Sequence, residues 1–199
     1  MDREHIGYRT LANDYLSCVS YLQDACEANV LRLRFDFPIL SNLSHATELA
    51  IKGHLLSLGM SKTEVVNLGH DLVAAYGRLE ECAPKIVDEV EKHVKTQWKS
   101  FLRKERNKVE KSFKAFGIHD PQYLREMGVL SNEDIGKELP TFRRDLRWLS
   151  DRHKSNGSKF RYFESALDRR QHIKAFGLNV FTVPVSVVSG TKLLIRLIN

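Results

Sequence analysis

The sequence predicts a mainly α-helical protein: a helical bundle with one long central helix and a small C-terminal β-hairpin. Apolar residues recur with helical spacing along most of the chain, which predicts several amphipathic helices. A run from Pro84 to Phe116 keeps this spacing and contains nothing that breaks a helix, which predicts the long helix. Residues 179–198 are rich in Val, Ile, Leu and Thr and contain Ser189-Gly190, a combination typical of a β-hairpin.

Length and composition indicate an ordinary globular protein. The chain has 199 residues, 42% hydrophobic and 28% charged, enough for one domain with a sizeable core or a core with an appendage. We expect a helical domain over residues 1–174 and a hairpin packed on the same domain over residues 175–199. Three cysteines, Cys18, Cys26 and Cys82, are odd in number and lack metal-binding spacing, so reduced thiols are expected.

The first half of the chain predicts three helices. The first covers about residues 6–30, and the second begins at Pro38, a residue suited to a first helical turn, and ends before Gly59. Ser61 and Glu64 have the spacing of a capping box, which opens the third helix. This third helix is expected to carry its apolar face at Val65, Val66, Leu68, Leu72, Val73 and Tyr76.

The long helix and two shorter helices follow. Residues 84–116 would span close to 50 Å at about 1.5 Å per residue, more than a compact bundle needs, so this helix is expected to protrude or to serve a dimer. Asp120-Pro121 predicts a short helix by N-cap and first-turn chemistry. Pro140 precedes a further predicted helix over residues 141–154.

The net charge of +6 is distributed unevenly along the chain. Residues 1–84 carry 7 basic and 11 acidic side chains, whereas residues 85–114 carry 10 and 5 and residues 141–174 carry 10 and 4. The two basic segments would suit an acidic partner such as RNA. Lysine-rich faces that serve only solubility would give the same pattern.

Several classes of protein are disfavoured. No apolar run approaches the roughly 18 residues of a membrane helix, and the N-terminus lacks an apolar signal core, so we expect a cytoplasmic protein without membrane contact. The chain has no Gly-rich phosphate loop, no nucleophile elbow and no zinc-protease motif. Its eight histidines do not cluster in ligand spacings, so neither a metal nor another cofactor is predicted.

A candidate binding face lies within residues 43–72. Glu48 and Lys52 are four residues apart in the order that favours pairing on one helix face. His70 and Asp71 follow in a Gly-His-Asp-Leu element. An exposed ion pair and a helix kink at the glycine would explain the same residues without any function.

The whole stretch resembles a HEPN domain, in the subgroup that contains Gly-His-Asp-Leu. The resemblance rests on a Glu-Leu-Ala-x-Lys pattern with Leu-Leu after it, a short loop, and then Gly-His-Asp-Leu. HEPN domains are small helical bundles, and many are metal-independent ribonucleases that act as toxins or antiviral effectors, while others have lost the catalytic pair. The resemblance therefore implies a HEPN-like bundle, a toxin or defence role, and RNA as a possible substrate.

The catalytic pair of that family is an Arg followed after four to six residues by a His, with two copies meeting across a dimer cleft. The His would assist proton transfer from a ribose 2′-hydroxyl and the Arg would stabilise charge on the phosphate. Arg147 and His153 match this spacing, so they are the candidate catalytic residues. Arg161 and Tyr162 also look like the subgroup, and they join Glu48, Lys52, His70 and Asp71 as candidate binding residues.

Three functions stay open at this point. The first is a homodimeric endoribonuclease, controlled by a neutralising protein partner. The second is a catalytically silent HEPN-like module that binds a nucleotide, RNA or a protein. The third is a structural helical protein that dimerises through its long helix.

Overall fold

The computed structural model describes residues 4–28, 30, 37–126, 129, 139–153, 172–175, 178–181 and 183–198. Within these ranges the chain is mainly helical, as predicted. The helices are α1 (Glu4–Glu27), α2 (Phe37–Ser57), α3 (Lys62–Asn67), α4 (Leu72–Cys82), α5 (Pro84–Ala115), α6 (Pro121–Glu126), α7 (Phe142–His153) and α8 (Val183–Leu197). Two short strands, β1 (His172–Ala175) and β2 (Leu178–Phe181), precede α8.

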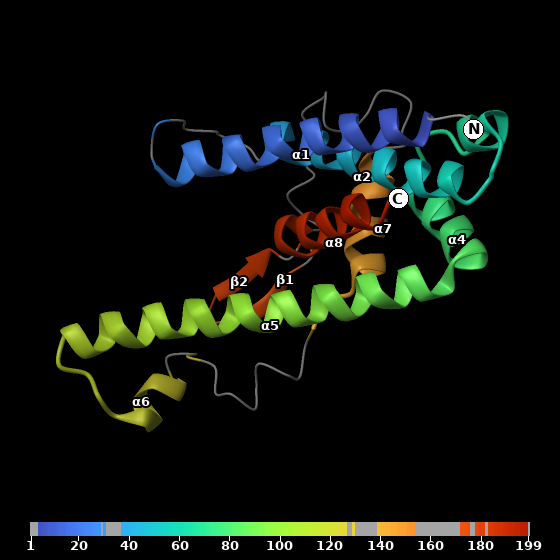
Figure 1. Cartoon of the computed structure of the whole chain (residues 1–199). Helices are drawn as coiled ribbons and strands as arrows, with labels where there is room; N and C mark the ends of the chain where they lie inside the picture. Colours follow the sequence, from blue (N-terminus) through green and yellow to red (C-terminus); the bar gives the residue numbers. More distant parts are fainter. Residues whose placement is uncertain are drawn as a thin grey trace.

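Helix α8 lies at the centre of the arrangement, with the α1–α2 pair on one side and α5 on the other (Figure 1). It packs against α1, α2, α5 and α7. The core combines apolar side chains of α1, α2, α4, α5, α7 and α8, together with Val65 of α3. Among the described residues, no helix is both long and apolar enough to cross a membrane.

Helix α5 is the predicted long helix, and only its first part is embedded in the core. Its buried residues are spaced three or four apart, which keeps them on one face: Val87, Val90, Val94, Trp98 and Leu102. No residue of α5 after Leu102 is buried, and Phe116, just past its end, is 83% exposed. The C-terminal third of α5 therefore extends past the core toward α6 (Figure 1). A role in dimerisation remains a prediction.

The single helix predicted from Ser61 onward is in fact two helices. The capping box is present, since Ser61 accepts from the Glu64 amide and the Glu64 side chain accepts from the Ser61 amide. The chain then turns at Gly69, whose φ of 57° lies in the left-handed region. Asp71 restarts the helix as N-cap of α4, accepting hydrogen bonds from the amides of Val73 and Ala74 at 3.1 Å. The Gly-His-Asp-Leu element thus forms the turn after α3 and the N-terminus of α4.

The predicted C-terminal hairpin is wrong, because most of its residues form α8. Val187, Thr191, Leu194 and Ile198 are all buried, and their spacing is that of one helix face. Burial against four other helices outweighs the modest strand preference of Val and Ile. A smaller antiparallel hairpin does occur just before α8, where His172 of β1 pairs with Phe181 of β2.

A carboxylate from another helix caps the N-terminus of α7. Glu91 of α5 accepts hydrogen bonds from the amides of Phe142 and Arg143, both at 2.9 Å, so it satisfies two of the first-turn donors of α7. We expect Glu91→Gln to lower the free energy of unfolding by about 1–2 kcal/mol, because the charge and one acceptor are lost. Glu89→Gln, at an exposed position of the same helix, should change it by less than about 0.5 kcal/mol in urea titrations. Equal effects of the two changes would contradict this capping role.

Candidate functional site at Glu48

Glu48 is the centre of a buried polar cluster that joins three parts of the fold. Its Oε1 accepts a hydrogen bond from Lys52 Nζ at 2.7 Å, one turn later in α2. Its Oε2 lies 2.7 Å from His153 Nε2 at the end of α7 and 3.0 Å from His70 Nδ1 in the turn between α3 and α4. One carboxylate therefore links residues 105 positions apart in the sequence.

Local structure explains how these side chains reach Glu48. Gly69 turns the chain so that its carbonyl accepts a second hydrogen bond from Lys52 Nζ, also at 2.7 Å. The N-cap carboxylate of Asp71 also accepts from Ser150 Oγ at 3.1 Å, and Ser150 lies one turn before His153 on α7. The last turn of α7 is thus held twice, by Asp71 and by Glu48.

Burial divides the cluster into a hidden part and an exposed part. Glu48, Lys52 and His153 are only 6%, 7% and 7% exposed, whereas the His70 side chain is 65% exposed. Burial alone would raise the pKa of the Glu48 carboxyl, but hydrogen bonds from its three partners outweigh burial and lower the pKa to about 2. Glu48 is therefore a carboxylate at neutral pH, and it holds one imidazole that reaches solvent.

A third histidine adjoins the cluster. The His45 ring packs edge-on against His153 with ring centroids 4.8 Å apart, and His70 does the same from another side at 5.4 Å. Within the described residues, His45, Glu48 and His153 each offer a potential ligand atom, and these atoms lie within 4.8 Å of one another. Imidazole and carboxylate would suit a metal such as Zn²⁺. A metal would have to displace the hydrogen bond between His153 and Glu48.

The structure brings together most of the sequence-predicted residues. Lys52, His70 and His153 all bond to Glu48, and Asp71 is connected to α7 through Ser150. The four were expected to be either a binding face or a solvated ion pair, and the Glu48–Lys52 pair is buried rather than solvated. Sequence reasoning missed two residues, His45 and Ser150. Each lies three positions before a cluster residue on its own helix, which is the spacing that could have indicated them.

Arg147 does not join the cluster around His153. It is an exposed residue of α7, and six residues of helix place it about 120° around the axis from the buried His153. The predicted pair therefore occupies two different faces of one helix. Arg161 and Tyr162 lie outside the described residues.

No family model, curated protein or solved structure matches the chain. The HEPN resemblance therefore rests on the residues themselves.

Proposed function

We propose that the chain is a HEPN-like, metal-independent endoribonuclease whose acid–base centre is the Glu48 cluster. The observation that supports this most is the hydrogen bond from the exposed His70 to a buried carboxylate. Cleavage of RNA at the ribose 2′-hydroxyl needs a group that exchanges protons near neutral pH, and imidazole is such a group. The bond at Nδ1 fixes the ring and leaves Nε2 for a substrate.

The other residues take supporting roles in this proposal. His153 is buried, so we assign it a positioning role: it shares Oε2 of Glu48 with His70 and keeps the carboxylate in place. Lys52 neutralises the second oxygen. Arg147 is exposed and forms no ion pair with the described residues, so it is available to bind an RNA phosphate, including one held by a second copy of the chain.

Cleavage of a fluorescent RNA in the presence of EDTA tests the proposal. We expect the wild type to cleave it, and His70→Ala to lower the rate by about 100-fold or more, since a positioned acid or base contributes that much. His119→Ala is the matched control, because His119 is exposed in the segment between α5 and α6. Cleavage that EDTA abolishes, or that His70→Ala leaves unchanged, would contradict the proposal.

Growth of the host cell offers a second readout. A ribonuclease with a toxin or antiviral defence role should slow growth when expressed without a neutralising partner. Expression of His70→Ala at the same level should not. Equal growth inhibition by both proteins would show that any toxicity does not depend on His70 and the Glu48 cluster.

A non-catalytic binding module is the second candidate, and the buried position of His153 favours it. With 7% exposure, His153 cannot itself touch a substrate in this conformation. This alternative predicts saturable binding of RNA or a nucleotide while the RNA stays intact over long incubation. Arg147→Ala should then weaken binding, and no variant should change the integrity of the RNA.

A further inference from the structure

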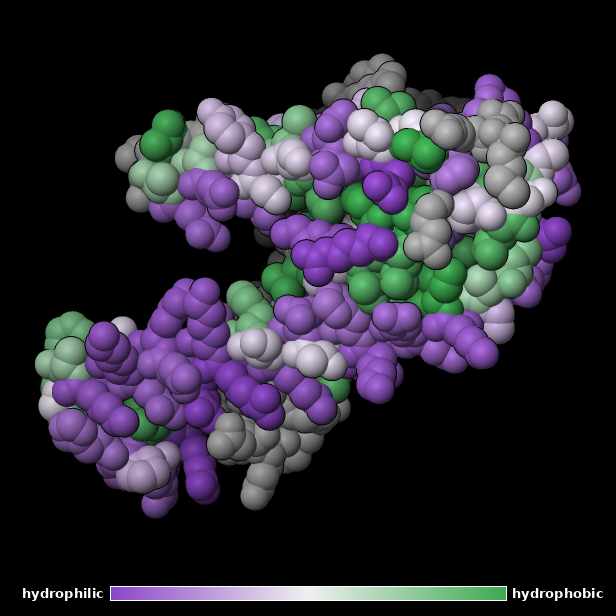
Figure 2. Space-filling view, in the orientation of Figure 1, coloured by the Kyte–Doolittle hydropathy of each residue, from purple (hydrophilic) through white to green (hydrophobic). Residues whose placement is uncertain are grey.

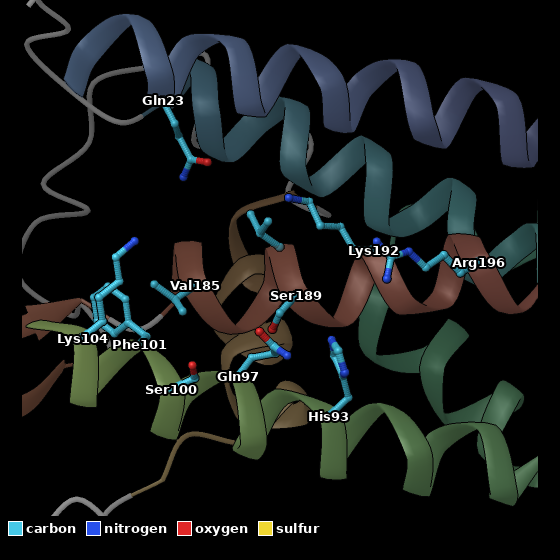
Figure 3. Close-up of a pocket in the computed structure, with 11 residues that line it drawn as sticks. Gln23, His93, Gln97, Ser100, Phe101, Lys104, Val185, Ser189, Lys192 and Arg196 are labelled. Atoms are coloured by element: carbon cyan, nitrogen blue, oxygen red, sulfur yellow. The ribbon is translucent and has the colours of Figure 1, made fainter. Parts of the chain in front are cut away.

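A second site lies on the other side of α8, in a groove between α1 and α5 (Figure 3). The groove has a volume of about 460 Å³, and a second hollow of about 470 Å³ shares Lys192 and Arg196 with it. The space-filling view shows the molecule hollowed between α1 and α5 (Figure 2). No residue of the Glu48 cluster lines either hollow.

The charge of this groove is one-sided. Lys192 and Arg196 of α8 and Lys104 of α5 line it, and no acidic side chain is among the described residues that line it. One carboxylate, Asp24, lines the adjoining hollow that shares Lys192 and Arg196. None of these three cations forms a salt bridge with any other described residue. Elsewhere in the described structure, cations such as Lys62, Arg78 and Arg143 do have carboxylate partners. A groove lined by three cations that have no salt-bridge partner among the described residues favours an anionic ligand.

A histidine, His93, also lines this groove. Burial and then the nearby charge of Arg196 lower the pKa of His93, against a smaller opposing effect of Glu89. A bound anion would offset the positive charge of Arg196. Figure 3 shows His93 and Gln97 rising from α5 toward α8, so their polar groups are within the same hollow.

One aromatic ring completes the groove. Phe101 of α5 is half-buried and stacks on Trp98, with ring centroids 5.0 Å apart, so its ring is held in place. It lies beside Lys104, at the opposite end of the groove from Arg196 (Figure 3). A fixed ring near cations is suited to stacking with one nucleobase.

We propose that this groove binds a single nucleotide, its phosphates contacting Lys192 and Arg196 and its base lying against Phe101. The volume falls in the range of small-molecule sites and exceeds what inorganic phosphate would fill. Because the lining supplies one aromatic ring, it suits one base better than a strand of RNA. The proposal is independent of the function assigned to the Glu48 cluster, since the two sites share no residue.

Calorimetric titration of the full chain with ATP, at 150 mM salt, tests this site. We expect one ATP per chain, and an affinity about 100-fold lower in Lys192→Ala/Arg196→Ala, because two charge-assisted contacts are lost. Lys85→Ala/Lys95→Ala removes the same charge from exposed positions of α5 outside the groove and should leave the affinity unchanged. Equal losses of ATP affinity in both double variants would overturn the proposal, since binding would then depend only on the net charge of the protein.

Three further probes test the assignment of the base and phosphates. Phe101→Leu, which keeps the apolar bulk, should weaken ATP several-fold and leave inorganic tripolyphosphate unaffected. Adenosine alone should bind far more weakly than ATP. Absence of ATP binding at millimolar concentration would overturn the proposal. A 12-nucleotide RNA that binds more tightly than ATP, and that is weakened as much as ATP by Lys192→Ala/Arg196→Ala, would also overturn it. The groove would then be a site for an RNA strand rather than for one nucleotide.

Discussion

Glu48→Ala should destabilise the protein by about 3–5 kcal/mol, the usual cost of removing one partner of a buried ion pair. Lys52 Nζ would keep only the carbonyl of Gly69, and the buried His153 Nε2 would lose its partner. The turn at His70 and the end of α7 would also lose their common attachment. Guanidinium unfolding measures the effect directly.

An exposed ion pair provides the control for Glu48. Arg78 and Glu81 lie 2.6 Å apart on α4 with side chains 46% and 66% exposed. Glu81→Ala should therefore cost less than about 1 kcal/mol. A Glu48→Ala protein as stable as Glu81→Ala would show that the cluster contributes little to the fold.

The Glu48 contribution should depend on pH in a defined direction. The pKa of Glu48 is lowered from 4.5 to about 2 in the folded protein, so the folded state favours the carboxylate. Stability from this group is complete above pH 4.5 and is lost as pH falls toward 2. The full contribution is on the order of 3 kcal/mol. Unfolding of wild type and Glu48→Gln from pH 7 to pH 3 should show their difference narrowing below pH 4.5. A constant difference would contradict this.

Gly190→Ala is expected to be the most damaging small substitution in α8. A Cβ at this position would overlap the ring of Phe142, which is fully buried and packs edge-on against Tyr76 with centroids 5.1 Å apart. Because both rings are buried, we expect a loss of about 3 kcal/mol, the upper range of overpacking. Thermal or chemical unfolding tests this.

A second helical glycine makes the result diagnostic. Apart from the neighbouring backbone of its own helix, Gly77 of α4 has no atom within 4 Å of where its Cβ would lie. Gly77→Ala should therefore stabilise the protein by up to about 1 kcal/mol, as Ala normally does in a helix. Adding Phe142→Leu to Gly190→Ala should recover part of the lost stability relative to the sum of the single effects. If Gly190→Ala stabilises as Gly77→Ala does, then α8 and α7 do not pack as closely as described.

The sequence identified the helices wherever signals lay close together along the chain. Proline at the start of α5, the Ser61–Glu64 capping box and the apolar spacing of α2 act within one or two turns, so no knowledge of distant residues was needed. The same local signals misled at the C-terminus. Ser189-Gly190 has the composition of a turn, but Gly190 is needed because Phe142, 48 positions earlier, occupies the space of a side chain.

The candidate site was predicted only in part, for a related reason. The spacing of Glu48 and Lys52 indicated that they would pair, because both lie on one helix. It could not indicate that the pair is buried, nor that His153 would reach it while Arg147 turns to solvent. Those outcomes depend on how α7 is rotated against α2 and α4.

The sequence by itself determined a helical chain, the approximate bounds of α1, α2, α5 and α7 and the residue types that carry its chemistry, because each follows from periodicity and capping within a few residues. Only the tertiary structure decided that α8 is a central helix, that one carboxylate holds two histidines and that three cations face one groove. Packing between helices far apart in sequence fixes these features, since it determines which face of each helix is buried.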